Sequence, residues 1–295
     1  MNTKRLLLIS AILFTTILAW ILPVEAQNRP PQNVYRVTVT SRYEIKDGKR
    51  TTNSRAIRQE IKDSLGRTHT ILNRDYESQR VTSHTWHTFS GKIITRTDEF
   101  ENERLIRFHL FTYTPDSLIA SEAIYRVQPG DTSLYLNIRY GYTNRRPVQA
   151  IATSATGKKA YTLKSEWDSQ GTEIKRTVKS KKGFAPLDSI ALLTCHPTYD
   201  SLGRKVAETI SRKFLDGSSK TQQFRYAYDS KGNRIMIEEL NPSGSTIART
   251  EMQYNDKGML KFISRFDAQN NLIDYQAIRY ELYPSRNRLN MIIEY

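Results

Sequence analysis

The sequence predicts an all-β protein: a long antiparallel meander of successive hairpins that forms a curled or elongated sheet, after an N-terminal signal peptide. Turn-forming residues recur 11 to 15 residues apart from Gly91 onward, with one longer gap between Gly183 and Gly203. The segments between them alternate apolar and polar residues, and no long amphipathic helix pattern occurs. One strand plus one tight turn has about this length, so the spacing is typical of an antiparallel β-meander.

Residues 1–26 are expected to be a signal peptide that does not belong to the fold. A basic start precedes an apolar run from Leu6 to Leu22, and Val24 and Ala26 suit cleavage after Ala26. An uncleaved membrane anchor is the alternative, but the run from Leu6 to Leu22 is short for a spanning helix, which needs about 20 apolar residues. We therefore expect an exported chain, in the periplasm, at the outer-membrane surface or outside the cell, with no transmembrane segment after cleavage.

The remaining chain is expected to have two halves. Residues 27–185 would form an N-terminal β-meander, and residues 186–295 a C-terminal region of β-repeats, either as separate domains or as one continuous sheet. The boundary is placed in the gap between Gly183 and Gly203, where the turn spacing fails. The segment Pro186 to Cys195 in this gap is the best helix candidate of the chain.

Strand segments show a period of two. In "SLYLNIRYGY" one face would carry Leu134, Leu136, Ile138, Tyr140 and Tyr142. In "MLKFISRF" the apolar residues Leu260, Phe262 and Phe266 would lie opposite Lys261 and Arg265. Such alternation predicts strands with one buried and one solvated face.

A five-residue motif recurs at the turns: an aromatic residue, then Asp or Asn, then two mostly polar residues, and then Gly. The copies are Trp167-Asp168-Ser169-Gln170-Gly171, Tyr199-Asp200-Ser201-Leu202-Gly203, Tyr228-Asp229-Ser230-Lys231-Gly232 and Tyr254-Asn255-Asp256-Lys257-Gly258. "DSLGR" also occurs twice, at residues 63–67 and 200–204. Asp or Asn side chains accept hydrogen bonds from nearby backbone amides and start a turn, and Gly tolerates a positive φ. The aromatic residue would end its strand and could pack on its counterpart in the next hairpin.

The motif resembles the YD repeat, also called the RHS repeat, in a degenerate form. The resemblance covers about Tyr199 to Tyr283, and its best-matched copies are those at Tyr199 and Tyr228, the latter continuing into Asn233 and Arg234. It implies an elongated β-sheet that coils on itself in exported or surface-associated proteins. The family has no common catalytic residue that could be transferred to this chain.

No catalytic residue, cofactor or metal ligand can be assigned from the sequence. Cys195 is the only cysteine, so no internal disulfide is expected, and its neighbour His196 should point to the opposite face of a strand. His84 and His87 are three residues apart and would also face opposite sides. The carboxylates from Asp98 to Glu103 lack the spacing of a calcium loop.

Basic residues concentrate between Tyr142 and Gly183. Within the net charge of +15 of the whole chain, this segment carries ten basic and three acidic residues. Nine form the candidate anionic-ligand patch: Arg145, Arg146, Lys158, Lys159, Lys175, Arg176, Lys179, Lys181 and Lys182. Lipopolysaccharide, another anionic glycan or an envelope protein could bind there, whereas export disfavours nucleic acid. Solubility and protection of strand edges explain the same charges without a ligand.

Four tripeptides of Asp-Ser followed by Leu or Ile are similar to a bacterial acceptor pattern for O-glycosylation. Their serines are Ser64, Ser117, Ser189 and Ser201. Turn formation explains the same tripeptides without glycans.

Together these features lead to the hypothesis of an exported, non-enzymatic β-repeat protein that acts as a binding or scaffold module in a Gram-negative cell envelope. The alternatives are an enzyme that acts on envelope glycans or lipids, and a carrier that holds an acyl chain on a curled sheet.

Overall fold

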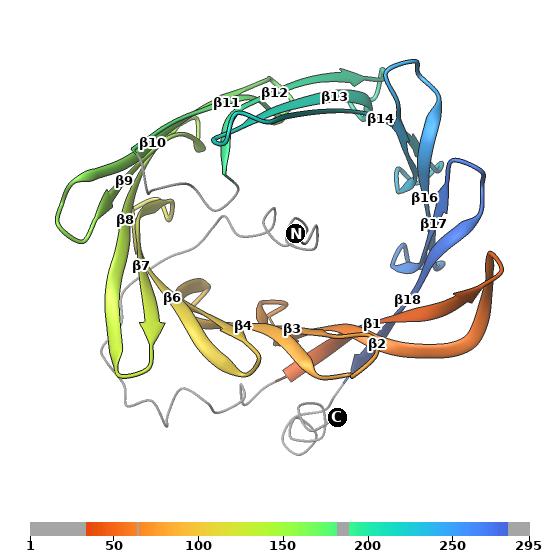
Figure 1. Cartoon of the computed structure of the whole chain (residues 1–295), viewed down its shortest axis with the longest axis horizontal. Coiled ribbons are helices and arrows are strands. Elements are labelled where there is room, and N and C mark those ends of the chain that lie inside the picture. Colours follow the sequence, from red (N-terminus) through yellow and green to blue (C-terminus); the bar gives the residue numbers. More distant parts are fainter. Residues whose placement is uncertain (1–33, 64, 182–188, 283–295) are drawn as a thin grey trace. The chain divides into compact units, whose positions relative to one another are not determined.

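A computed structural model describes residues 34–63, 65–181 and 189–282 of the chain, and no helix occurs among them. The predicted signal peptide, residues 1–26, lies outside the described residues. The predicted all-β fold of successive antiparallel hairpins is confirmed (Figure 1). The described strands are β1 (Val34–Lys46), β2 (Lys49–Asp63), β3 (Thr68–Arg74), β4 (Val81–Ser90), β5 (Ile93–Glu101), β6 (Arg104–Tyr113), β7 (Ile119–Gln128), β8 (Asp131–Thr143), β9 (Arg146–Ser154), β10 (Lys159–Trp167), β11 (Glu173–Ser180), β12 (Ile190–Tyr199), β13 (Lys205–Phe214), β14 (Ser219–Tyr228), β15 (Arg234–Leu240), β16 (Thr246–Tyr254), β17 (Leu260–Asp267) and β18 (Leu272–Leu282).

The described residues divide into two compact units, called here the first and the second unit. The first unit comprises Ile93–Arg96 and Phe108–Gln223. The second comprises the described parts of Ala19–Lys92, Thr97–Arg107 and Phe224–Tyr295. Each unit is described separately below.

In the first unit, consecutive strands from β7 to β13 pair in antiparallel register. Tyr140 lies opposite Ala150 on β8 and β9, Leu163 opposite Val178 on β10 and β11, and Cys195 opposite Ile210 on β12 and β13. One face of this sheet carries a buried apolar cluster: Ile124, Leu136, Ile138, Ala150, Ala152, Ala160, Tyr161 and Val178. Leu136 and Ile138 therefore confirm the buried face predicted from their alternation.

In the second unit, the first and last described strands lie side by side. β15 to β18 form a meander, β18 pairs with β1, and β1 to β4 continue the sheet. Val37 lies opposite Glu281 of β18 and opposite Ile61 of β2. Val37 and Ile61 are almost fully buried, so this seam between distant chain segments lies in the core of the unit.

The predicted helix from Pro186 to Cys195 is wrong from Ile190 onward, where the structure has a strand. Residues 182–188 lie outside the described residues, but Ile190 begins β12. Leu193 and Cys195 are buried, and β12 pairs with both β11 and β13. Pairing with β11 and β13 provides hydrogen bonds for the backbone of β12. A short apolar run can form a helix or a strand, and runs of this length more often form strands. The domain division at residues 185 and 186 stays a prediction.

The turn motif builds the same turn wherever the structure describes it. In the copy at Asp200, the Gly203 N–H donates to the Asp200 carbonyl and the Asp200 N–H donates to the Arg204 carbonyl, both at 3.0 Å. The Asp200 Oδ1 atom accepts hydrogen bonds from the Leu202 and Arg204 N–H groups, both at 2.9 Å. The same pair of bonds to a side-chain oxygen recurs at Asp63, Asp229, Asn255 and Asp267. The motif is therefore a structural element of the hairpins.

The aromatic residue of the motif also has a structural role. The Tyr254 hydroxyl donates to the Arg234 carbonyl at 2.9 Å, and the Trp167 indole N–H donates to the Pro147 carbonyl at 2.8 Å. Each bond joins the end of the second strand of a hairpin to the start of its first strand. These aromatic residues thus fix their own hairpins, a role that the sequence did not predict.

Replacing Gly203 by valine is expected to lower the free energy of unfolding by roughly 1–3 kcal/mol. Gly203 has a φ of +74°, which a β-branched side chain adopts only with strain. The added Cβ atom would lie 3.5 Å from the Gln170 Oε1 atom, an ordinary contact, so backbone conformation is the cause. Urea denaturation measures the loss.

The matched control is Gly203→Asn. Asn270 occupies the equivalent place in the turn that begins at Asp267, with a φ of 64°. Asn should therefore cost less than Val at position 203. Equal losses in the two variants would contradict the explanation from φ.

Candidate functional site

Part of the predicted anionic-ligand patch is engaged in holding turns and strands together. Arg145 lies beside Asp116, with 3.6 Å between the Arg145 Nη1 and Asp116 Oδ2 atoms. Arg146 donates to the Ser169 carbonyl at 3.3 Å and to the carbonyl of Asp168. The Arg176 Nε atom is 3.2 Å from the Glu173 Oε2 atom, and both side chains are largely buried. These three arginines act first as structural residues.

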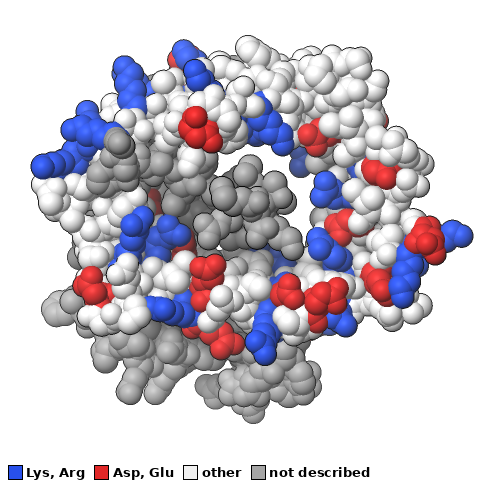
Figure 2. All heavy atoms as spheres, in the orientation of Figure 1, with Lys and Arg blue, Asp and Glu red and all other residues white. Residues whose placement is uncertain are grey.

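The lysines of the patch are more accessible. Lys158, Lys159, Lys175, Lys179 and Lys181 are all exposed, whereas Lys182 lies outside the described residues. Lys175 is 2.6 Å from the Glu166 carboxylate, so its charge is balanced. Figure 2 shows Lys and Arg gathered over β9–β11 at the upper left.

The sheet register adds exposed cations outside the nine predicted residues of the patch. Lys164 on β10 lies opposite Thr177, Thr177 lies opposite Leu192, and Leu192 lies opposite Lys213 on β13. A second row runs from Arg139 through Ile151 and Thr162 to Lys179. Because directly opposite residues in antiparallel strands share a face, these rows lie on one side of the sheet.

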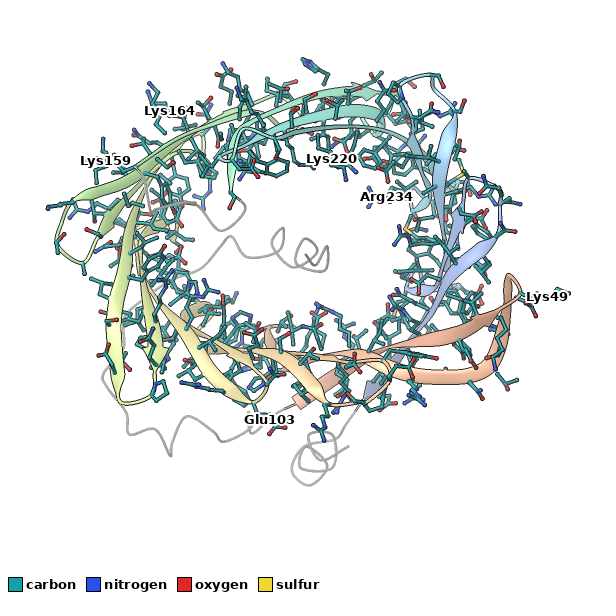
Figure 3. All side chains as sticks on the ribbon, viewed as in Figure 1. Lys49, Glu103, Lys159, Lys164, Lys220 and Arg234 are labelled. Atoms are coloured by element: carbon teal, nitrogen blue, oxygen red, sulfur yellow. The ribbon has the colours of Figure 1, made fainter. Side chains whose placement is uncertain are left out.

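We call this side of the first unit the Lys–Thr face. Its charged residues are Arg139, Lys164, Glu166, Lys175, Lys179 and Lys213, and its hydroxyl residues include Thr162, Thr177, Thr194, Thr198, Thr209 and Ser211. Arg139, Lys164, Lys179 and Lys213 are exposed and have no ion-pair partner within the described part of the chain. Figure 3 labels Lys164 and its neighbour Lys159 on β10.

The opposite side of the same strands is apolar. Val178 alternates with Thr177 and Lys179 along β11 and is buried, as is Tyr161 beside Thr162 on β10. A slip of the strand register by one residue would move the lysines to the buried side and the apolar residues to the surface. Burial of the apolar residues therefore keeps the lysines on the exposed side. The face is therefore fixed by the core of the unit.

The candidate O-glycosylation serines fall in or beside turns. Ser117 and Ser201 are exposed, and Ser117 has a φ of 64°. Ser189 is exposed immediately before β12, whereas Ser64 lies outside the described residues. Their modification stays a prediction.

Three titratable side chains meet inside the first unit. The His109 Nδ1 atom on β6 is 2.6 Å from the Glu122 Oε1 atom on β7, and the Tyr140 hydroxyl on β8 donates to the Glu122 Oε2 atom at 2.5 Å. His109 is 1% exposed and Glu122 is 9% exposed. Burial first, and then the Glu122 carboxylate, raise the pKa of Tyr140 well above its usual value, so its hydroxyl remains a donor. We call these three residues the His–Glu–Tyr network.

The single cysteine has the character of a core residue. Cys195 is buried and His196 is exposed, as expected for neighbours on a strand. The Cys195 thiol lies 3.2 Å from the Glu208 Oε2 atom. Burial, followed by the Glu208 carboxylate, raises the pKa of Cys195 to about 12, so the thiol is protonated at neutral pH.

His84 and His87 make contacts within the sheet. The His84 ring stacks on Phe100 with 3.9 Å between centroids, and the His87 Nδ1 atom is 2.9 Å from the Thr97 hydroxyl. Within residues 34–63, 65–181 and 189–282, no cluster of three His, Cys, Asp or Glu residues could hold a metal ion. The same residues include no helix long and apolar enough to span a membrane.

Comparison with known proteins finds likenesses among solved structures alone. No protein-family model matches the chain, and no curated protein matches it. A porin-like protein from Bacteroides uniformis is similar over 86% of this chain and 99% of its own, with 10% identity and a TM-score of 0.40. A DUF1329 family protein from Desulfovibrio piger is similar over 85% of this chain and 84% of its own, with 9% identity and a TM-score of 0.22.

The TcdB2-TccC3 structure is also similar to the chain. The match covers 80% of this chain, with 11% identity and a TM-score of 0.29. This chain spans about a fifth of the TcdB2-TccC3 chain, since the match covers 19% of it. None of these likenesses identifies what the chain binds.

Proposed function

We propose that the chain is an exported, non-enzymatic protein of degenerate YD-like β-repeats. It acts as a binding or scaffold module in the envelope of a Gram-negative bacterium and engages an anionic envelope component. The observation that supports this function best is the Lys–Thr face. There Arg139, Lys164, Lys179 and Lys213, on β8, β10, β11 and β13, are exposed without ion-pair partners among the described residues. Opposite charges across an interface guide association.

The motif residues support a role as scaffold and not as catalytic site. The carboxylates of Asp63, Asp200 and Asp229 accept hydrogen bonds from backbone N–H groups of their own turns. Of the buried carboxylates, Glu122 is bound by His109 and Tyr140, and Asp274 lies 2.8 Å from the Arg42 Nε atom. Such carboxylates support the fold, because their charges are compensated where they stand.

Sedimentation with isolated envelopes tests the proposed function. The full chain, as processed by cells that export it, is mixed with Gram-negative envelopes and centrifuged at increasing NaCl concentration. We expect the chain to sediment with the envelopes at low salt and to be released as salt rises, since the Debye length falls from about 10 Å at 0.1 M to about 3 Å at 1 M. A chain that stays in the supernatant at low salt, or binding that salt does not change, would contradict the proposal.

A further inference from the structure

We infer that the ligand of the Lys–Thr face is an acidic polysaccharide, which lies in an extended form across β8 to β13. This inference rests on the proposed function and names the chemical class of the anionic component. It depends on the spacing of the cations, on the groups between them and on the side chains that the face lacks.

The spacing of the cations suits a polymer better than a small anion. Lys164 and Lys179 are one strand apart and offset by two residues, which corresponds to about 5 Å across the strands and about 7 Å along them. Lys213 is three strands from Lys164, or about 14 Å. No single phosphate or carboxylate can contact all three ammonium groups over such distances. A chain that carries one negative charge per repeat can contact each in turn.

The groups between the lysines suit a hydroxylated ligand. Thr162, Thr177, Thr194 and Ser211 occupy the positions between or beside the cations on the same face. Each hydroxyl can both donate and accept a hydrogen bond, as sugar hydroxyls do. A surface of ammonium and hydroxyl groups therefore matches a polymer of carboxylate and hydroxyl groups.

On β10 to β13, the face lacks the aromatic and large exposed apolar side chains that often bind nucleic acids and membranes. Its described positions on β10 to β13 include no Phe, Trp or Tyr; they are Thr162, Lys164, Glu166, Lys175, Thr177, Lys179, Leu192, Thr194, His196, Thr198, Ala207, Thr209, Ser211 and Lys213. Proteins that bind single-stranded nucleic acids combine a basic groove with aromatic side chains on which the bases stack. Membrane-surface binding by insertion uses exposed apolar side chains, and the exposed large ones of the described residues, such as Leu202 and Ile247, lie outside this face.

Binding to polygalacturonate tests the inference, with the full chain as the protein. We expect binding at low salt and no binding to neutral dextran. The triple variant Lys164→Glu, Lys179→Glu, Lys213→Glu should raise the Kd for polygalacturonate roughly 10- to 100-fold, because three attractive contacts become repulsive. Unchanged far-UV circular dichroism and an unchanged Tm establish that the variant is folded.

The matched control reverses three exposed lysines outside the face: Lys49→Glu, Lys220→Glu and Lys257→Glu. Lys49 and Lys220 are labelled in Figure 3. This variant has the same net charge as the first and should keep its affinity within about threefold of the wild type, since distant exposed charges are screened. Equal weakening by the two variants would overturn the inference, because net charge alone would then explain the binding.

Two other ligands distinguish the remaining outcomes. Tighter binding to phosphatidylglycerol vesicles or to a single-stranded oligothymidine than to polygalacturonate would overturn the inference in favour of a membrane or a nucleic acid. A chain that sediments with envelopes but does not bind polygalacturonate would overturn the inference and leave the proposed function intact. A chain that binds neither would overturn both.

Discussion

The Glu122→Ala variant is expected to lose about 3–5 kcal/mol of unfolding free energy. Glu122 is the shared acceptor of the His–Glu–Tyr network, at 2.6 Å from His109 and 2.5 Å from the Tyr140 hydroxyl. Its removal leaves two buried polar groups without this acceptor, and replacing their lost bonds with water would require opening the core. Urea denaturation followed by tyrosine and tryptophan fluorescence measures the loss.

Glu122→Gln is the conservative control. The amide has nearly the same shape, its oxygen can accept from Tyr140, and its nitrogen can donate to the His109 Nδ1 atom. We therefore expect a smaller loss than with alanine. Tyr140→Phe combined with Glu122→Ala should cost less than the sum of the two single losses, because both changes remove the same bond. Additive losses would show that the network does not act as a unit.

Asp63→Asn should destabilise the second unit by about 2–4 kcal/mol, far more than the same change at Asp200. The two residues begin identical "DSLGR" turns, but Asp63 is 4% exposed. Its Oδ2 atom is 2.5 Å from the Arg67 Nε atom and 3.0 Å from the His69 Nε2 atom. An amide cannot balance the charge of Arg67 there. Thermal and urea denaturation of the two variants measure the difference.

The effect of pH provides a second readout. Burial tends to raise the pKa of Asp63, but hydrogen bonds from Arg67 and His69 outweigh it and lower the pKa in the folded state. A carboxyl with a lowered pKa stabilises the fold above its unfolded pKa, near 4, and loses that contribution as the pH falls through its folded value. The gap between the wild type and Asp63→Asn should therefore narrow in acid. A gap that is constant from pH 7 to pH 3 would contradict a role for the charge.

Asp200→Asn should change the free energy of unfolding very little, because asparagine starts an equivalent turn elsewhere in the chain. Asn255 starts its turn with the same two backbone hydrogen bonds, to the Lys257 and Met259 N–H groups. On replacement, Asp200 loses its ion pair with Arg204, but both side chains are partly open to solvent, where ion pairs contribute little. The motif thus tolerates either residue except where the turn is buried.

Much of the fold could be predicted because its signals are local. The turn at Asp200, the positive φ of Gly203 and the alternation of Leu136 and Ile138 all depend on residues close together in sequence. The strand that begins at Ile190 is locally ambiguous, because its apolar run fits both the helical and the strand period over a few residues. Pairing with β11 and β13 decides between them, and the sequence does not show that pairing.

The candidate site was predictable only in part for the same reason. Lys164 and Lys213 come into one row because four strands align residue by residue, and a shift of one residue would place them on opposite sides. His109, Glu122 and Tyr140 come from three successive strands, and none has a sequence signal of its own. Conversely, the charge of Arg146 predicts a ligand contact, whereas its guanidinium donates to the Ser169 carbonyl of a neighbouring turn.

The pairing of β1 with β18 has a consequence for the order of events in the cell. Val37 is among the first described residues to be synthesised, and its neighbour Glu281 is among the last. Until β18 emerges from the ribosome, β1 has one open edge on which another strand could add. Pairs so far apart in sequence also form slowly. The second unit therefore stays incompletely folded until β18 has been synthesised, because the last partner of β1 is missing until then.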